Sequence, residues 1–287
     1  MATILICGHR SYAARGLKEL LEKKGHHVLC FSRGEEKREG DVITGPVVNI
    51  VRNKHFMEPI DVVINFILIQ NGDAKVNEDY MSALLMFCEK QCVKRLIQIS
   101  SISSYPNDAK LINESSPTET CMERKGHYGL IKSAADGVLE RAIGHTDMEI
   151  VLARPGYIVA DDNPHPFKGV AKFVGRKFAI LFGNKRSTLP CILRSTLHEC
   201  LEEIATQAEP LPVYLLVEGE NTTKYSYFKS QSNAMIMPLP KWLFILAANT
   251  AKSLHVIGDK TASGIKGVFK VQKFDNSKTK NKLHCLK

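Results

Sequence analysis

Residues 3–14 read TILICGHRSYAA, and this stretch decides the fold. Residues 3–7 are mostly apolar, which predicts a short buried strand. Residues 11–24 carry their leucines on one helical face and end before Gly25, which predicts an amphipathic helix. A strand that leads through small residues into a helix is the first unit of a sheet whose strands alternate with helices.

The same alternation continues through the first two-thirds of the chain. A strand at residues 61–69 is apolar almost throughout, as expected where both faces of a sheet are covered. The pattern predicts an α/β fold with a doubly wound parallel sheet of the Rossmann type, and ligands outside the carboxyl ends of its strands. The remaining predicted strands are 27–31, 47–51, 95–100 and 149–154, and the remaining helices are 78–90 and 128–143.

After Arg154-Pro155 the pattern loosens. We therefore divide the chain into a nucleotide-binding domain at residues 1–160 and a smaller substrate lobe at residues 161–287, with room for segments of the lobe to return to the sheet. Within the lobe, residues 211–217 predict a strand and residues 238–257 an apolar helix. We expect Trp242 of that helix to pack on the lobe, with contact to a membrane surface as the alternative.

Composition narrows the class of protein. Of the 287 residues, 44% are hydrophobic and 24% charged, which is typical of an ordered globular chain. No apolar run approaches the roughly 18 residues of a membrane span, and residues 1–7 lack the basic region of a secretory signal. Eight scattered cysteines without a CxxC pair indicate free thiols of a reducing compartment, so we expect a cytoplasmic protein. The histidines lack metal-ligand spacing, and we expect no metal site.

The net charge of +9 permits nucleic-acid binding. The basic residues are spread along the chain, however, and no stripe of them alternates with aromatic residues. Pockets for phosphate-bearing small molecules explain the charge at least as well. We therefore expect a small-molecule ligand and no nucleic-acid partner.

The loop after the first strand has the form of a dinucleotide site. Gly8, Ser11 and Ala14 occupy the places of a GxxGxxG loop, where small residues let the backbone approach a pyrophosphate. We assign Gly8, Arg10, Ser11 and Tyr12 of this loop to cofactor binding. Phe66, Ile67 and Pro155, which follow later strands, are assigned to the same site by position.

The second strand ends at Ser32-Arg33, which bears on the choice of cofactor. An acidic residue there would hold the ribose hydroxyls of NAD, whereas an arginine suits the additional phosphate of NADP. Arg10 lies in the loop that faces the same place. The sequence therefore predicts NADP rather than NAD.

A serine cluster at residues 100–104 and the pair Tyr128 and Lys132 predict the catalytic residues. A tyrosine and a lysine four residues apart share one helix face. A nearby ammonium favours the phenolate, which would lower the pKa of Tyr128 and make it a usable acid or base. Ser101 would hold the substrate oxygen, and Lys132 can also bind the nicotinamide ribose. Tyr225 and Lys229 have the same spacing but no serine-rich strand end before them, and we interpret that pair as structural.

In this order the motifs resemble the extended short-chain dehydrogenase/reductase family, the NAD(P)-dependent group of nucleotide-sugar epimerases, dehydratases and reductases. The resemblance covers roughly residues 3–160 and implies a nucleotide-sugar substrate held between the lobes, and a homodimer formed through two helices per subunit. It is carried by the Gly8 loop, the DVVIN run at 61–65, the VKRLIQISS run at 93–101, Tyr128 with Lys132, Arg154-Pro155-Gly156 and the DNSK run at 275–278.

The serine cluster also bears on the reaction. Dehydratases of the family have Thr-Asp-Glu where this chain has Ser101-Ile102-Ser103, so the acid and base for water elimination are absent. The Gly8-His9-Arg10 loop and Tyr105-Pro106 resemble the NADPH-dependent GDP-fucose synthase. Its epimerising cysteine corresponds to Ser103, and its histidine is lost near Asp162. Of the reactions of the family, the resemblance therefore leaves reduction of a keto-sugar. We expect Ser101, Ser103 and Tyr157 to face the substrate.

Three alternatives stay open. A nucleotide-sugar 4-epimerase would keep NAD tightly bound between turnovers. A catalytically silent regulatory protein would sense NADP without reacting. A nucleic-acid-associated protein would use the positive charge.

Overall fold

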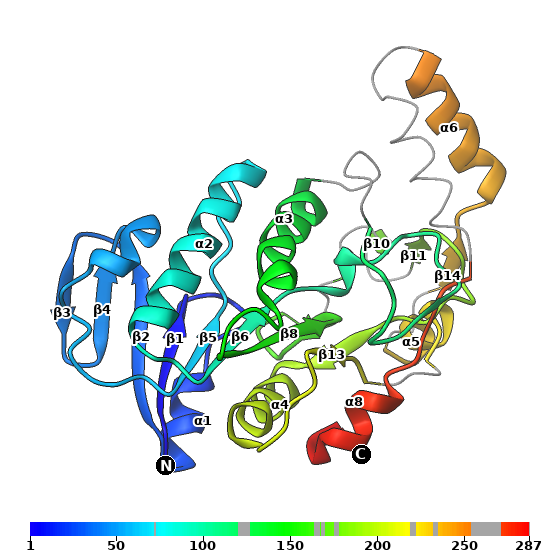
Figure 1. Ribbon diagram of the computed structural model, residues 1–287. Helices are drawn as coiled ribbons and strands as arrows, with labels where there is room; N and C mark the ends of the chain where they lie inside the picture. Colours follow the sequence, from blue (N-terminus) through cyan, green and yellow to red (C-terminus); the bar gives the residue numbers. More distant parts are fainter. Residues whose placement is uncertain are drawn as a thin grey trace.

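The computed structural model describes residues 1–71, 73–119, 127–163, 167, 170–174, 178–218, 222–231, 235–253 and 271–286 (Figure 1). Its centre is an eight-stranded sheet in the order β13-β8-β6-β5-β1-β2-β4-β3. Neighbouring strands are parallel, except that β3 runs antiparallel to β4 at one edge. The strands are β1 (Thr3–Cys7), β2 (His27–Arg33), β3 (Lys37–Glu39), β4 (Val42–Gly45), β5 (Val62–Asn65), β6 (Arg95–Ile99), β8 (Glu149–Pro155) and β13 (Val213–Leu216).

Helices cover both faces of this sheet (Figure 1). One face is covered by α2 (Ala74–Lys90), α3 (His127–Ala142) and the 3₁₀ helix η1 (Val47–Arg52), whose buried side chains form one core with β1 and β6. The other face is covered by α1 (Leu17–Lys23), α4 (Arg194–Thr206) and η4 (His284–Leu286), next to α8 (Ser277–Lys282). The predicted doubly wound Rossmann fold is confirmed.

Three of the local predictions were wrong. The first helix begins at Leu17 rather than at residue 11, because Gly16 adopts a left-handed conformation (φ +96°) that interrupts the helix. Residues 47–51 form part of η1 and not a strand, since Val47 and Ile50 reach the core at a spacing of three. The third parallel strand is instead β4, and the predicted strand at 61–69 ends at Asn65.

The C-terminal part returns to the sheet. β13 pairs with β8 at the sheet edge, and α4 packs near α1, so residues 161–287 supply both sheet and core as well as the lobe. Outside the central sheet lie the helices α5 (Lys224–Gln231) and α6 (Lys241–Ser253) and three small sheets. In these sheets β9 (Tyr157–Val159) pairs with β12 (Cys191–Leu193), β11 (Phe178–Leu181) pairs with both β10 (Ala171–Val174) and β14 (Met235–Pro238), and β7 (Leu111–Ile112) pairs with β15 (Lys273–Phe274).

Helix α6 projects from the body of the molecule (Figure 1). Trp242 on this helix is 67% exposed, so the prediction that it packs on the lobe is wrong. The helix points outward, which leaves this side chain little to pack against. Residues 254–257 of the predicted helical stretch lie outside the described residues.

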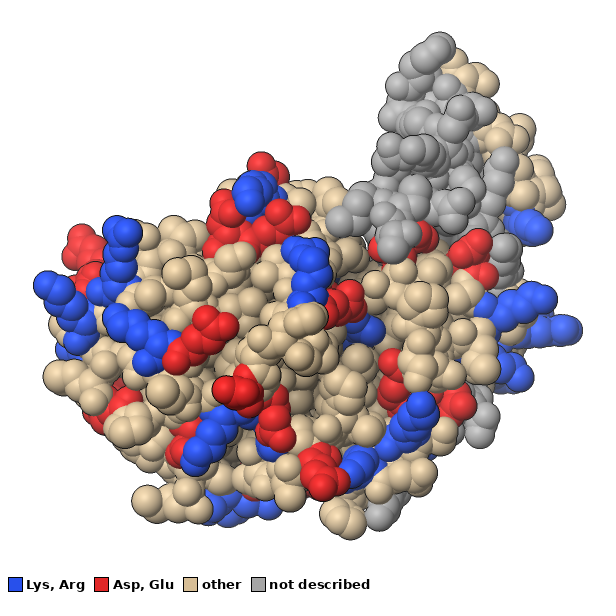
Figure 2. All heavy atoms as spheres, in the orientation of Figure 1, with Lys and Arg blue, Asp and Glu red and all other residues tan. Residues whose placement is uncertain are grey.

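Basic and acidic side chains are interspersed on the described surface of the face in Figure 2, without a continuous basic stripe there. Seven of the eight cysteines are described, all as free thiols, and Cys121 lies outside the described residues. Among the described helices, none combines the length and apolar character needed to cross a membrane.

Candidate functional site

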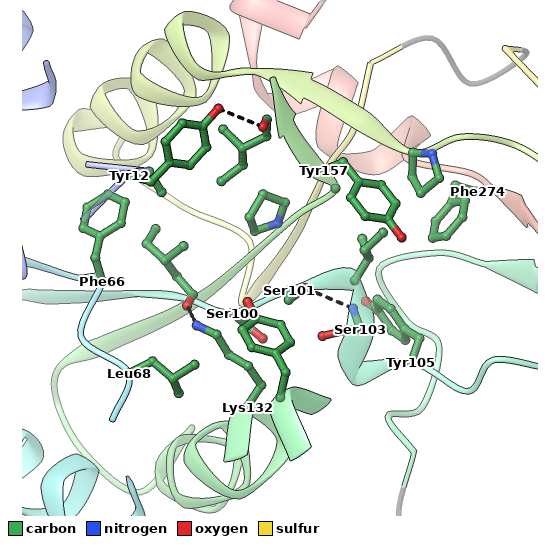
Figure 3. A pocket seen from close by; sticks show the side chains of 18 of the residues that line it. Tyr12, Phe66, Leu68, Ser100, Ser101, Ser103, Tyr105, Lys132, Tyr157 and Phe274 are labelled. Atoms are coloured by element: carbon green, nitrogen blue, oxygen red, sulfur yellow. Dashed lines mark hydrogen bonds between the residues drawn. The ribbon is translucent and has the colours of Figure 1, made fainter. Parts of the chain in front are cut away.

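A cavity of about 610 Å³ lies at the carboxyl ends of the central strands (Figure 3). Its wall includes residues that follow β1, β5, β6 and β8, together with the start of α3 and segments of the lobe. Parallel strands deliver their carboxyl ends to one edge, which is where ligands bind in such sheets. The predicted residues Ser11, Tyr12, Phe66, Ser101, Ser103, Tyr128, Lys132, Pro155 and Tyr157 all line this cavity.

The serine cluster divides into two sets. Ser100 and Ser104 are buried and their hydroxyls contact the Asp136 carboxylate of α3. The Ser101 hydroxyl instead acts on Tyr128, where it opposes the rise in the pKa of the phenol, and its oxygen accepts the backbone N–H of Ser103 at 3.1 Å. Ser101 is therefore the residue of these three that acts on Tyr128 rather than on Asp136.

Lys132 lies one turn beyond Tyr128 on α3 and is buried. Its ammonium donates to the Ile99 carbonyl at 2.5 Å, at the end of β6 (Figure 3). Burial lowers the pKa of Lys132 to about 8, against an opposing effect of Asp136. The group therefore remains mainly protonated at neutral pH.

The pKa of Tyr128 differs from expectation. Its pKa is raised, because burial of the phenol disfavours the phenolate more than the Ser101 hydrogen bond favours it. We had expected the Lys132 ammonium to lower it. In the structure that ammonium is bound to the Ile99 carbonyl. Although 46% of the residue's surface is exposed, the phenol lines the cavity and is held in its protonated form, which suits a proton donor.

A buried ionic cluster supports α3 behind the cavity. Asp136 and Arg154 are 1% and 2% exposed, and Arg154 Nη2 lies 3.5 Å from Asp136 Oδ2 and 2.7 Å from Glu140 Oε1. Arg154 also donates to the Tyr105 hydroxyl at 3.1 Å. Burial raises the pKa of Asp136, opposed chiefly by Arg154. The cluster fixes α3, and with it Lys132, against β6 and β8.

The nucleotide loop approaches the chain after β5 closely. Gly8 has φ +83°, and a Cβ there would lie 3.0 Å from Ile67 Cγ1 and 3.2 Å from the Ile67 nitrogen. Only glycine fits this position. Ile67 therefore packs against the loop and does not line the cavity, whereas Phe66 before it does.

Helix α4 supports the loop from the other side. The His198 Nε2 lies 2.8 Å from the carbonyl oxygen of Ala13. Arg194 stacks over the Tyr12 ring at 5.1 Å and pairs with Asp162 at 3.0 Å. The Tyr12 hydroxyl donates to the Ile158 carbonyl at 3.1 Å, which joins the loop to β9.

Besides Gly8 and Ile67, three more predicted cofactor residues lie outside the cavity wall, at the neighbouring end of the sheet. Ser32 is 7% exposed, and its hydroxyl has no hydrogen-bond partner among the described residues. Arg33, the last residue of β2, and Arg10 are exposed, and neither forms an ion pair within the described part of the chain. A buried hydroxyl without a partner and two exposed, unpaired arginines at this end of the sheet are groups that can bind an anion.

Sequence reasoning missed part of the wall. Thr188, Lys224 and Gln272 of the lobe line the cavity, but they belong to no motif that would have revealed them. Phe274, at the start of the family-like closing stretch, lines it too. Tyr225 and Lys229 lie on α5 away from the wall, with the ammonium 5.8 Å from the ring, in keeping with a structural role. In the described residues no three His, Cys, Asp or Glu side chains gather as metal ligands.

Comparison with known proteins gives a family match. The family model described as "NAD dependent epimerase/dehydratase family" matches residues 4–181. No curated protein matches the sequence.

Solved structures share the fold at low sequence identity. The structure of gox2253 is 16% identical, with a TM-score of 0.75 over 99% of this chain and 93% of that one. Thermotoga maritima UDP-glucose 4-epimerase with UDP-glucose is 14% identical, with a TM-score of 0.69 over 98% and 92%. The human epimerase family protein SDR39U1 with NADPH is 16% identical, with a TM-score of 0.65 over 98% and 93%.

Proposed function

Because the chain belongs to the NAD dependent epimerase/dehydratase family, we propose that it is an NADP-dependent reductase of a nucleotide-linked keto-sugar. Membership confirms the resemblance expected from the sequence and the prediction of an NAD(P)-dependent enzyme. The observation that carries the proposal is that Ser101, Tyr128 and the buried Lys132 meet at the wall of one cavity, where the Ile99 carbonyl holds Lys132 in place. The homodimer and the cytoplasmic location stay predictions.

The residues fit a dinucleotide that carries an additional phosphate. The positive φ of Gly8 lets the loop turn closely against Ile67, and the loop then runs toward α1, the place where a pyrophosphate binds in sheets of this kind. The Ser32 hydroxyl and the guanidinium groups of Arg10 and Arg33 supply donors for a ribose phosphate. These features support NADP over NAD.

Each member of the trio has a distinct role in this proposal. NADPH, when bound, would supply the hydride. Ser101 holds the carbonyl oxygen of the substrate, and Tyr128 donates a proton to that oxygen as the alcohol forms. Lys132, protonated at neutral pH and held by the Ile99 carbonyl, orients the ribose of the cofactor.

Reduction is favoured over dehydration by the residues that are present. Water elimination needs a general acid and a general base beside the sugar. Ile102 and Ser103 supply neither, and none of the described residues that line the cavity is an aspartate or glutamate. A ketone reduction needs one proton donor, which Tyr128 provides.

Cofactor titration is the first test. Nicotinamide fluorescence of the purified protein is measured with NADPH and with NADH, after an assay for cofactor carried through purification. We expect strong preference for NADPH and nothing carried through. The double variant Arg10→Ala with Arg33→Ala should weaken NADPH about 100-fold more than NADH, because each charged hydrogen bond contributes on the order of 1.5–3 kcal/mol. Tightly retained NAD would instead indicate the epimerase.

A tyrosine pair provides a matched control for the chemistry. Tyr128→Phe should lower turnover about 100- to 10,000-fold, as measured by NADPH consumption with nucleoside-diphosphate keto-sugars, while NADPH binding is retained. Tyr225→Phe, in the second Tyr-x-x-x-Lys sequence, should leave turnover near the wild-type rate. Near-normal turnover in Tyr128→Phe would show that this tyrosine is not the acid and would favour the NADP sensor.

A further inference from the structure

The positive charge of the chain is concentrated in its second half. Residues 1–160 contain 20 basic and 20 acidic residues, so the whole net charge of +9 comes from residues 161–287. Within that half, residues 163–198 and 221–274 contain 15 lysines and arginines and a single acidic residue, Asp259. These two stretches include β10, β11, α5, β14 and α6. This part of the lobe is therefore strongly basic, although the nucleotide-binding part of the chain is neutral.

The small sheet formed by β10, β11 and β14 has one apolar face turned to solvent. Side chains alternate between the two faces of a strand, so the pairing of the strands shows which residues share a face. On the outer face the strand register aligns two rows, Val174 with Phe178 and Met235, and Lys172 with Ile180 and Met237. The side chains of Val174, Phe178, Met235 and Met237 are between 44% and 62% exposed. An exposed apolar face of this kind marks a site of interaction.

The opposite face of this sheet is covered by α5. Ala179 and Leu181, which alternate with the outer residues of β11, are buried. The Phe173 ring on the inner side of β10 lies 6.0 Å from the Phe228 ring of α5, and Ile236 of β14 packs against the same aromatic cluster. The sheet is thus held on its inner side, and its outer side is the one available to a partner.

Helix α6 continues the exposed apolar surface. It begins at Lys241, two residues after the end of β14, and stands away from the body of the molecule (Figure 1). Trp242, Leu243 and Leu246 near its start are between 40% and 67% exposed. They lie within about 100° of one another around the helix axis. Its 13 residues span about 20 Å, which suits a helix that lies at a surface and not one that crosses a bilayer.

Lysines accompany these apolar side chains. Lys172 lies on the outer face of the sheet, Lys241 is the first residue of α6, and both are exposed. Neither forms an ion pair within the described part of the chain. Figure 2 shows basic side chains along the edge of the molecule below α6. Exposed aliphatic and aromatic side chains next to unpaired lysines are the features of proteins that bind at the surface of an anionic bilayer.

The same features disfavour other partners. A contact between two copies of the chain would bring two basic surfaces together, which opposes association. Nucleic acid would attract the lysines, but its phosphate backbone gives no apolar environment to side chains such as Met235 and Leu246. A bilayer supplies both, because its headgroup region accepts tryptophan and lysine while the acyl chains below accept apolar side chains.

We propose that this chain binds the surface of an anionic membrane through α6 and the outer face of the β10–β11–β14 sheet, with lysines of the lobe next to the lipid phosphates. The contact is peripheral and reversible. It does not depend on the proposed reductase activity, since none of the apolar side chains that carry it lines the cavity.

The single tryptophan makes this contact measurable. Trp242 is the only tryptophan of the chain, so its fluorescence reports on α6. The full chain is titrated with vesicles of phosphatidylcholine and with vesicles of phosphatidylcholine and phosphatidylglycerol, and bound protein is counted after sedimentation of the vesicles. We expect a blue shift of the emission and cosedimentation with the anionic vesicles, both reduced by salt. Binding to phosphatidylcholine alone should be at least about tenfold weaker.

Two pairs of substitutions test the two apolar areas and keep the tryptophan in place. Leu243→Ser with Leu246→Ser on α6, and Met235→Ser with Met237→Ser on β14, should each weaken binding about 10- to 100-fold. Met57→Ser with Met86→Ser is the matched control, because these side chains are 74% and 59% exposed and lie in the nucleotide-binding part. The control should change binding less than about twofold, and all three pairs should keep a thermal midpoint close to wild type.

A charge reversal tests the basic component. Lys172→Glu should weaken binding to the anionic vesicles about tenfold. Lys23→Glu on α1 makes the same change in net charge, and it should have a smaller effect because it is not on the proposed surface. Equal effects of the two variants would show that the lobe is not the site of contact.

The inference is overturned if wild type sediments with neither kind of vesicle, if phosphatidylcholine alone binds it equally well, or if either serine pair on the lobe leaves binding unchanged. A dimer in sedimentation velocity that both lobe pairs dissociate, without binding to vesicles, would show that the apolar surface joins two copies of the chain. Tighter binding to duplex DNA than to anionic vesicles would likewise overturn the assignment to a membrane.

Discussion

The buried ammonium of Lys132 should lower the free energy of unfolding of the protein, and the size of this effect follows from the pKa of Lys132. Folding lowers this pKa from 10.5 to about 8, so the folded chain binds fewer protons than the unfolded chain between those values. Burying the charged Lys132 therefore lowers the free energy of unfolding, by about 3 kcal/mol below pH 8. The free energy of unfolding rises again as the pH approaches 10.5, because the lysine then loses its proton in both states. Lys132→Met removes this titration and also the hydrogen bond to Ile99, whose loss costs about 1 kcal/mol. The variant should therefore be about 2 kcal/mol more stable than wild type at pH 7.

The pH dependence of that difference is the decisive measurement. Between pH 7 and 9.5 the stability advantage of Lys132→Met should shrink by about 2 kcal/mol. Urea unfolding followed by circular dichroism at the two pH values gives both numbers. Lys23→Met, exposed on α1, is the matched control and should give the same difference at both pH values. An advantage for Lys132→Met that does not change with pH would refute the argument from a buried ammonium.

Three further predictions concern the scaffold of the site. Asp136→Asn should destabilise the protein by about 3–5 kcal/mol in urea unfolding, because it leaves the buried Arg154 without one of its partners. Glu140→Gln, which changes the 38% exposed partner of Arg154, should cost less than about 1 kcal/mol. Equal losses in the two variants would contradict this reasoning. Gly16→Ala should lower stability by about 1–2 kcal/mol, since φ is +96° there, and an unchanged thermal midpoint would show that the turn relaxes. Gly137→Ala should raise stability by roughly 0.5–1 kcal/mol, because the position is helical and a Cβ meets only the Arg141 side chain at 3.5 Å; a lower midpoint would point to unfavourable packing on α3.

Much of the fold could be predicted because buried strands appear in the sequence as short apolar runs that alternate with helical patterns. β1, β2, β6 and β8 were placed within about two residues, and the order of motifs located the strand ends that form the cavity. Local patterns do not record contacts between distant segments. The pairing of β13 with β8 and the partial burial of Lys224 depend on such contacts, and no motif marks them.

The serine cluster illustrates the same limit within the site. Four serines within five residues look equivalent in the sequence, which gave Ser101 by position alone. The structure distinguishes them, because the buried Asp136 takes Ser100 and Ser104, while Ser101 reaches Tyr128. The raised pKa of Tyr128 likewise depends on burial and on where the Lys132 ammonium points, which spacing does not give.

The core that joins α1 to α4 also contains Leu283 and Leu286, packed in one cluster with Ile4 and Leu17. The earliest and the latest described parts of the chain thus complete a single core. During synthesis on the ribosome, the strands through β8 can assemble with α1, but this face of the sheet is not fully covered until α4 and then residues 283–286 have emerged. An intermediate that lacks them exposes apolar surface, which favours aggregation.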